Sequence, residues 1–158
     1  ILYKPKNAVK APAIVHVHGG PSSQTTLGYR GPIQYLVNQG YALLDINYRG
    51  STGYGKTYVT LADRKHGDVD LKDCIYGKQY LQSLPWVNPD KIGIMGGSYG
   101  GYLVLAALAF EPEAFSCGVD NCGVSNWIRT IQESPPWWSI GLDWFREKIG
   151  DPVNDRDY

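Results

Sequence analysis

Short apolar runs, separated by stretches of mixed polarity, recur along the chain. Runs of this length bounded by turn residues are typical of strands buried on both faces. We expect four such strands, at Ala13–Val17, Tyr41–Ile46, Ile92–Met95 and Cys117–Val119. The first residues, Ile1–Lys4, also have an apolar start, and we expect them to add an antiparallel strand at one edge of the sheet.

Helical spacing fills the stretches between these runs. Pro32–Asn38 has one apolar face, and Asp68–Leu84 is the clearest amphipathic helix, with an acidic first turn and a proline directly after it. Tyr102–Phe110 is apolar on all sides and predicts a buried helix, and Trp144–Ile149 predicts a last short one. Strands that alternate with helices at this spacing predict an α/β fold with a mostly parallel sheet.

A sharp turn that carries Ser98 joins the strand at Ile92–Met95 to the apolar helix. Gly96–Gly100 fits G-x-S-x-G, in which a strained turn between strand and helix holds a nucleophilic serine above the sheet. The motif by itself is weak, and a glycine-rich packing turn with an idle serine is the alternative. The strand before it and the helix after it are the context that the motif requires, so we predict that Ser98 is a nucleophile.

A second candidate for the same site is the loop after the first long strand. Ala13–Val17 runs directly into His18-Gly19-Gly20-Pro21. A strand that ends in His-Gly-Gly presents backbone amides at the edge of a sheet, where they can receive an oxyanion. The alternative is a simple turn.

Gly50–Thr57 supports a function of another class. It matches G-x-x-x-x-G-K-[ST], the phosphate-binding P-loop, and it follows a strand as that loop should. A P-loop needs a firm helix after it, because the helix N-terminus helps to hold the phosphates. The stretch that follows is short and soon becomes charged, which counts against nucleotide binding.

Composition excludes several classes of partner. The chain has 15 basic and 15 acidic residues, so bulk charge gives no reason to expect nucleic acid or an anionic membrane as a partner. No apolar run is long enough to span a bilayer, and no signal peptide precedes the first strand, so we expect a soluble, cytoplasmic protein. The three cysteines are an odd number, and Cys74 and Cys117 lie in apolar segments where we expect them to pack as small hydrophobic residues. This usage favours a reducing compartment.

Several segments, in order, resemble the prolyl oligopeptidase family of serine peptidases, most closely its acylaminoacyl-peptidase and dipeptidyl-peptidase-like members. The matching segments are His16–Pro21, Asn47–Lys56, Gly67–Cys74, Gly93–Tyr102 and Glu133–Pro152. The resemblance implies an α/β-hydrolase domain, with helices on both faces of the sheet and usually a β-propeller before it. It also counts against the P-loop, since NYRGSTGYG looks like a signature of the family.

The resemblance implies roles for individual residues. Ser98 matches the nucleophile, and the backbone N–H groups of Gly20 and Tyr99 match the oxyanion hole. Trp127 matches a position that lines the pocket for the residue before the scissile bond, whereas we expect Tyr102 to lie in the core. Neither a cofactor nor a metal is implied.

The chain also departs from the family pattern. In α/β-hydrolases the acid and the histidine of the triad follow the serine, but His16, His18 and His66 all precede Ser98. We expect structural roles for His16 and His18 and a loop position for His66. Asp120 aligns with a strand before the lid and not with the triad acid. Residues 1–158 are therefore expected to form the N-terminal part of an α/β-hydrolase domain, without the strands that carry the acid and base.

The function predicted from these observations is that of a serine peptidase or esterase. It would act on short or acylated peptides through an acyl-enzyme on Ser98, and slowly in this chain alone. The alternatives are a nucleotide-binding P-loop protein and a non-catalytic hydrolase-like binding domain. The tryptophan-rich stretch at 127–144 is expected either to line a substrate pocket or to pack on a further part of the protein. The sheet would end at an uncovered edge, which predicts a possible homo-oligomer.

Overall fold

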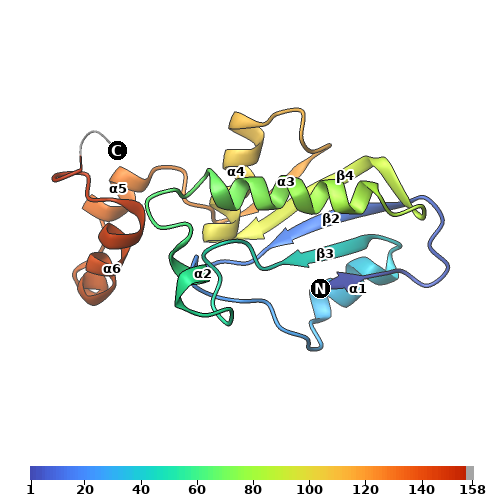
Figure 1. Cartoon of the computed structure of the whole chain (residues 1–158), viewed down its shortest axis with the longest axis horizontal. Helices are drawn as coiled ribbons and strands as arrows, with labels where there is room; N and C mark the ends of the chain where they lie inside the picture. Colours follow the sequence, from blue (N-terminus) through green and yellow to red (C-terminus); the bar gives the residue numbers. More distant parts are fainter. Residues whose placement is uncertain (156–158) are drawn as a thin grey trace.

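The computed structural model describes residues 1–155, apart from the side chains of Ser139 and Ile140. Its centre is a five-stranded sheet of order β1-β3-β2-β4-β5 (Figure 1). The strands are β1 (Leu2–Tyr3), β2 (Ala11–Val17), β3 (Ala42–Ile46), β4 (Val87–Gly97) and β5 (Gly118–Asn121). The last four are parallel, and β1 pairs antiparallel with β3. This confirms the predicted α/β class, the four parallel strands and the antiparallel edge.

The longest strand differs most from its prediction. β4 begins at Val87, five residues before the predicted start, and its first residue pairs with Ala11 across an irregularity in the ladder. The added residues include Pro89 and Asp90, and the exposed residues 89–91 interrupt the apolar pattern. Backbone pairing with β2 therefore extends β4 toward its N-terminus, through residues whose polar side chains did not predict a strand.

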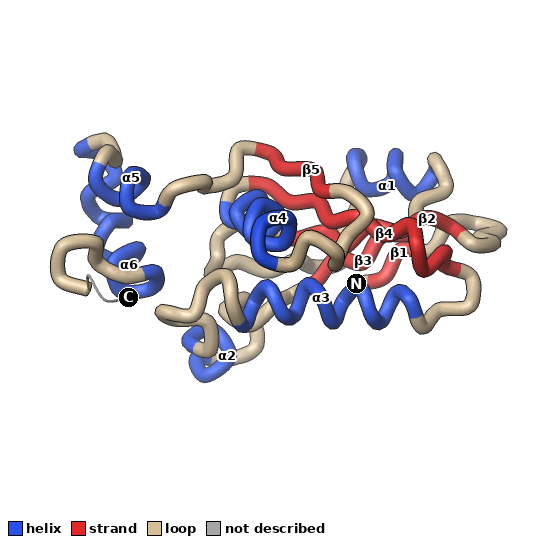
Figure 2. Tube along the Cα trace, turned by 90° about the horizontal axis from the view of Figure 1, so that it is seen from above, coloured by secondary structure: helices blue, strands red, loops and turns tan. Residues whose placement is uncertain are grey.

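Helices cover both faces of the sheet. Figure 2 shows α3 (Val69–Gln82) and α4 (Tyr99–Phe110) on one face and α1 (Gly31–Asn38) on the other. The remaining helices are α2 (Lys56–Thr60), α5 (Trp127–Gln132), a 3-10 turn (Pro136–Trp138) and α6 (Ser139–Ile149). α5 and α6 project beyond the carboxyl ends of the parallel strands, where active sites of α/β sheets are built.

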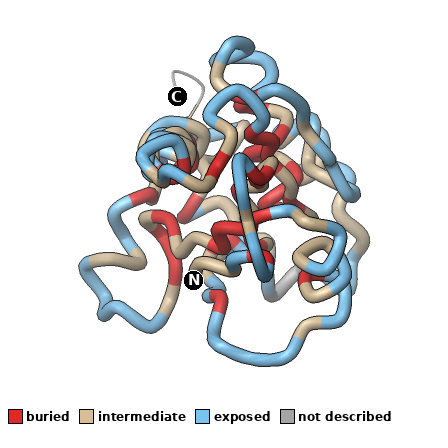
Figure 3. Tube along the Cα trace, turned by 90° about the vertical axis from the view of Figure 1, so that its right-hand side faces the viewer, coloured by how far each residue is buried: buried red, intermediate tan, exposed pale blue. Residues whose placement is uncertain are grey.

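The core lies between the sheet and the α3–α4 layer, and the buried segments gather in the interior in Figure 3. Its fully buried apolar side chains include Val15 of β2, Leu81 of α3, Ile94 of β4 and Leu103 of α4. Cys74 is buried in this cluster, as predicted. The prediction for Cys117 is wrong: it is exposed, because it directly precedes β5, an edge strand with one neighbour. Within residues 1–155 no helix combines the length and apolarity needed to cross a membrane.

Candidate active site

Ser98 lies at the junction of β4 and α4, as the motif predicted. Its backbone has φ 55° and ψ −121°, a left-handed conformation that a non-glycine residue rarely adopts. Two backbone hydrogen bonds hold it there: the Ser98 N–H donates to the Asn121 carbonyl at 2.9 Å, and the Tyr102 N–H donates to the Ser98 carbonyl at 3.0 Å. The Ser98 side chain is exposed. The fold therefore presents this hydroxyl to solvent above the sheet.

The glycines of the motif are required by close backbone contacts. A Cβ on Gly96 would lie 2.5 Å from the carbonyl carbon of Gly100, and a Cβ on Gly100 would lie 2.2 Å from the Val17 carbonyl oxygen. Both distances are shorter than any contact that a real side chain makes with backbone. The turn thus packs directly against the end of β2, and only residues without a side chain fit there.

The loop after β2 passes beside the Ser98 side chain. A Cβ on Gly19 would lie 3.3 Å from Ser98 Cβ and 3.8 Å from Ser98 Oγ. Gly20 follows with φ 137°, a conformation that glycine adopts readily. The predicted proximity of the His-Gly-Gly loop to Ser98 is therefore present in the structure.

Two of the three histidines make contacts that support this loop and the sheet. His18 Nε2 lies 2.9 Å from Ser51 Oγ and His18 Nδ1 lies 2.7 Å from the Gly19 carbonyl oxygen, while its ring stacks on Tyr48 at 4.4 Å. Burial lowers the pKa of His18 and favours the neutral ring. His16 Nδ1 lies 2.9 Å from Asp45 Oδ1. Among the described residues neither histidine is hydrogen-bonded to Ser98, in line with their predicted structural roles.

Asp45 is the buried partner of His16. Its carboxylate has no exposed surface, and it accepts hydrogen bonds from Thr25 and Arg30 as well. Burial alone would raise the pKa of Asp45, but the hydrogen bonds from His16 and Thr25 and the charge of Arg30 outweigh it, and the pKa is lowered. This carboxylate fastens the segment before α1 to β3.

Gly50–Thr57 does not form a phosphate-binding loop. Its amides are used inside the chain: Gly50 N–H donates to the Tyr58 carbonyl at 3.0 Å, Ser51 N–H to that of Tyr48 at 2.9 Å and Thr52 N–H to that of Ser23 at 2.8 Å. The helix that follows, α2, has only five residues. Ser51 is fully buried and contacts His18, so the segment supports the His-Gly-Gly loop.

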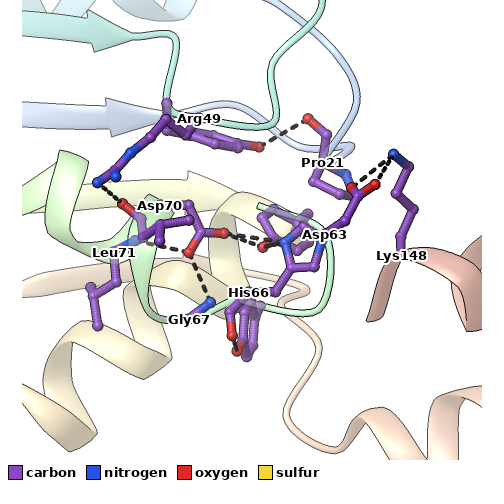
Figure 4. A network of polar contacts seen from close by, with 12 residues as sticks. Pro21, Arg49, Asp63, His66, Gly67, Asp70, Leu71 and Lys148 are labelled. Carbon is purple, nitrogen blue, oxygen red and sulfur yellow. Dashed lines mark hydrogen bonds and ion pairs between the residues drawn. The ribbon is translucent and has the colours of Figure 1, made fainter. Parts of the chain in front are cut away.

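A buried carboxylate, Asp70, anchors the side chain of Tyr99, the residue after Ser98; Figure 4 shows Asp70 beside Gly67, Leu71 and His66. Asp70 Oδ1 accepts from the N–H groups of Gly67 at 2.8 Å and Leu71 at 2.9 Å, and Asp70 Oδ2 accepts from the Tyr99 hydroxyl. Burial raises the pKa of Tyr99 well above its ordinary value, and the nearby Asp70 charge adds to this. This pair was not predicted from the sequence, although Asp70 stands in the acidic first turn of α3.

His66 belongs to the same cluster. It lies in the turn before α3, so its predicted loop position is confirmed, but its side chain is only 4% exposed. His66 Nδ1 contacts the Tyr99 hydroxyl and lies 3.3 Å from Asp70 Oδ2. The local sequence carried no sign of this burial, because the contacts come from α4, 33 residues later.

A cavity of about 450 Å³ opens between this turn and the segment from α5 to Asp155. Trp127 and Tyr102 both line it. Tyr102 also packs against the core, so its predicted core position is correct in part: the residue is half-buried between the core and the cavity. Trp127 packs 5.2 Å from Tyr102 and 6.0 Å from Tyr99 between ring centroids. Ile128 and Ile131 also line the cavity, and they belong to the stretch 127–144, for which lining a pocket was one of the two expectations. The remaining lining residues were not predicted, and they are His66, Ile149, Gly150, Asp151, Pro152 and Asp155.

Two ion pairs fasten the far wall of this cavity. Lys148 of α6 is 7% exposed, and its Nζ lies 2.8 Å and 2.9 Å from the two carboxylate oxygens of Asp63 (Figure 4). Arg64 pairs with Asp155 at 3.0 Å, and its N–H donates to the Lys148 carbonyl at 2.7 Å. These contacts hold the end of α6 against the turn that precedes α3.

No acid, base or metal site is assembled around Ser98 by the part of the chain that is described. Asp120 is exposed at the end of β5 and accepts a hydrogen bond from the Gly123 N–H at 2.8 Å. His66, like the other two histidines, has no hydrogen bond to Ser98 within residues 1–155. The same residues contain no group of three or more His, Cys, Asp or Glu side chains placed to hold a metal ion.

The sequence profile of the prolyl oligopeptidase family matches residues 28–155. The chain belongs to this family. It is 40% identical over 144 residues to the dipeptidyl aminopeptidase BIII of Pseudoxanthomonas mexicana, covering 91% of this chain and 21% of that protein. It is also 33% identical over 128 residues to the acylamino-acid-releasing enzyme of Arabidopsis thaliana, covering 80% and 17%.

Solved structures of family members share the fold. The acylaminoacyl peptidase of Pyrococcus horikoshii superposes with a TM-score of 0.87 at 33% identity, covering 99% of this chain and 25% of that one. An acylaminoacyl peptidase in complex with Z-Gly-Gly-Phe-chloromethyl ketone gives the same TM-score at 34% identity, with the same coverage. The fold is therefore that of the α/β-hydrolase-type peptidases. The chain spans about a fifth of the length of the curated relatives named above.

Proposed function

We propose that the protein containing this chain is a serine peptidase or esterase that acts on short or acylated peptides through an acyl-enzyme on Ser98. The observation that carries the proposal is the exposed Ser98 at φ 55°, directly beside the backbone of Gly19. A nucleophile needs this exposure and a neighbouring set of donors for the oxyanion. The relatives named above are peptidases, which supports the same reaction class.

The oxyanion donors in this proposal are the backbone N–H groups of Tyr99 and Gly20. Tyr99 is the first residue of α4, where an N–H has no partner within the helix and the helix dipole favours negative charge. Gly20 follows Gly19 in the loop that passes Ser98. Trp127 and the cavity that it lines would receive a substrate side chain.

A fluorophosphonate probe tests the nucleophile. We expect the full-length protein to be labelled at Ser98 and the label to be lost in Ser98→Ala, because the probe reacts with an activated serine hydroxyl. Ser125→Ala is the matched control, since Ser125 is also exposed but lies outside the junction of β4 and α4. Labelling that survives Ser98→Ala would assign the nucleophile to another residue. Absence of labelling would favour a non-catalytic binding domain.

We expect the 158-residue chain alone to turn over p-nitrophenyl esters far more slowly than an intact triad does. Ser98 has no histidine hydrogen-bonded to it among the described residues, and without a triad about 10³–10⁴-fold acceleration over water remains, from the oxyanion hole and binding. Fast turnover that is lost in His66→Ala would identify His66 as a base and contradict this expectation.

We also propose that the β5 edge associates with a second copy when the chain is isolated. β5 pairs with β4 on one side only, and Val119 on this strand is 54% exposed. An unpaired strand edge with apolar side chains is a template for pairing with another chain. Light scattering on the 158-residue chain should give the mass of a dimer or larger species, and a monodisperse monomer would contradict the proposal.

A further inference from the structure

The peptide between Gly19 and Gly20 carries one of the two oxyanion donors proposed above, the Gly20 N–H. This peptide is trans. In a trans peptide the C=O and the N–H lie in one plane and point in opposite directions. The Gly20 N–H is hydrogen-bonded to no acceptor within residues 1–155. A contact that holds the Gly19 carbonyl therefore also sets the direction of an N–H that is free to bind an oxyanion.

The side chain of His18 makes that contact. His18 Nδ1 lies 2.7 Å from the Gly19 carbonyl oxygen, which only accepts hydrogen bonds, so Nδ1 carries the hydrogen. In the neutral ring Nε2 is then an acceptor, and the Ser51 hydroxyl donates to it at 2.9 Å. Burial lowers the pKa of His18, which favours this neutral form. The contacts thus select one tautomer, whose donor holds the Gly19 carbonyl.

Further contacts fix the ring of His18. Tyr48 stacks on it with 4.4 Å between ring centroids, and the Tyr48 hydroxyl donates to the His18 carbonyl at 3.0 Å. The Ser51 N–H donates to the Tyr48 carbonyl at 2.9 Å, so one turn after β3 supplies both the stacking ring and the Ser51 hydroxyl. All three residues are buried. A buried side chain whose polar atoms are all hydrogen-bonded has little freedom to turn.

The backbone that His18 holds lies next to Ser98. A Cβ on Gly19 would lie 3.3 Å from Ser98 Cβ. The His18 ring is buried, whereas the Ser98 side chain is exposed. Because the Gly19 carbonyl is directed to the buried ring, the Gly20 N–H is directed away from that ring.

We propose that His18 is a positioning residue for the reaction: by donating from Nδ1 to the Gly19 carbonyl, it turns the Gly20 N–H toward the oxyanion that forms beside Ser98. Ser51 and Tyr48 keep the His18 ring in place. His18 transfers no proton and acts only through the peptide that it holds. Donors fixed in advance are effective because they need no rearrangement when charge develops. This inference rests on the proposed function.

Two substitutions separate the two nitrogens of His18. The side-chain amide of asparagine reaches the place of Nδ1, and that of glutamine reaches the place of Nε2. His18→Asn therefore keeps a donor for the Gly19 carbonyl, whereas His18→Gln does not. In the full-length protein, kcat and KM are measured for p-nitrophenyl acetate. Dividing kcat by the number of sites counted at the end point of fluorophosphonate labelling corrects for molecules that do not fold.

We expect His18→Gln to lower kcat per site by about 10–100-fold, part of the loss of about 10²–10³-fold that removal of a whole oxyanion donor causes. KM should change little, because the donor acts on the transition state. His18→Asn should be about tenfold more active per site than His18→Gln, the factor that one hydrogen bond supplies. A role in stability alone would change the number of labelled sites and leave kcat per site the same in both variants.

His16→Gln is the matched control. His16 lies two residues before His18, but its Nδ1 is paired with Asp45, so kcat per site should stay unchanged. Equal kcat per site in His18→Asn and His18→Gln, or an equal loss in His16→Gln, would overturn the proposal.

Ser51→Ala decides if His18→Gln yields no labelled sites. Because the Ser51 hydroxyl fixes the His18 ring through Nε2, kcat per site should fall several-fold with KM unchanged. A value equal to that of the parent protein would overturn the proposal. A parent protein that is neither labelled nor active would instead refute the proposed function, and this inference with it.

Discussion

Removing the Asp70 carboxylate should destabilise the chain more than any other loss of a single acidic side chain in the α3 region. Asp70 is fully buried and accepts four hydrogen bonds, from the N–H groups of Gly67 and Leu71, the Tyr99 hydroxyl and His66 Nδ1. In Asp70→Ala these donors lose their acceptor. Three of these donors have almost no exposed surface around them: Leu71 and Tyr99 are buried residues, and the side chain of His66 is 4% exposed.

The magnitude follows from the cost of each orphaned donor. A buried donor without a partner costs about 1–3 kcal/mol, and water that enters the space left by the carboxylate recovers part of this. Because neighbouring losses are not additive, we expect Asp70→Ala to lower the free energy of unfolding by about 3–5 kcal/mol in total. This is a large part of the stability of a typical domain, about 5–15 kcal/mol.

Urea unfolding of the 158-residue chain, followed by circular dichroism, measures this loss. Asp68→Ala is the matched control, because Asp68 is exposed and its ion pair within the described residues is the one with Lys72, across one helical turn. A surface pair of this kind is worth about 0.3–0.5 kcal/mol. If Asp70→Ala lies within about 1 kcal/mol of the control, the buried cluster does not contribute as argued. In the Asp70→Ala background, Tyr99→Phe should also cost less than in the parent chain, since its hydroxyl has already lost its acceptor.

Three further outcomes follow from other contacts. Gly100→Ala should abolish fluorophosphonate labelling and lower the midpoint of urea unfolding, because its Cβ would lie 2.2 Å from the Val17 carbonyl oxygen; Gly28→Ala, where nothing lies within 4 Å, should change neither. The pKa of Asp45 is held below its ordinary value of 3.8, so its stabilisation is present above pH 3.8 and is lost as pH falls below it. Asp45→Asn should remove this decrease in the free energy of unfolding at low pH. If the free energy of unfolding of Asp45→Asn falls with acid as steeply as that of the parent chain, Asp45 is not its source. Lys148→Ala should increase hydrogen exchange in α6 by removing its buried pair with Asp63, whereas equal exchange would show that the pair does not hold the helix.

The sequence by itself determined the elements whose signal is local. Apolar runs located the four parallel strands, and G-x-S-x-G placed Ser98 on a strand-to-helix turn, because a turn this tight admits only glycine at Gly96 and Gly100. The family resemblance also rests on such local motifs, and the match to residues 28–155 bears it out. The roles of Gly20, Tyr99 and Trp127 in catalysis remain predictions.

Only the tertiary structure decided features that depend on contacts between distant segments. The start of β4 at Val87 comes from pairing with β2, and the exposure of Cys117 comes from its place beside an edge strand. From the sequence, His66 is predicted to be an ordinary loop histidine. Its burial comes from the contact with Tyr99 of α4, 33 residues away along the chain. Burial and hydrogen bonding are properties of the surroundings that the whole fold creates. A pattern of residue types along one segment therefore locates a turn or a strand, but it does not reveal which polar groups the fold brings together.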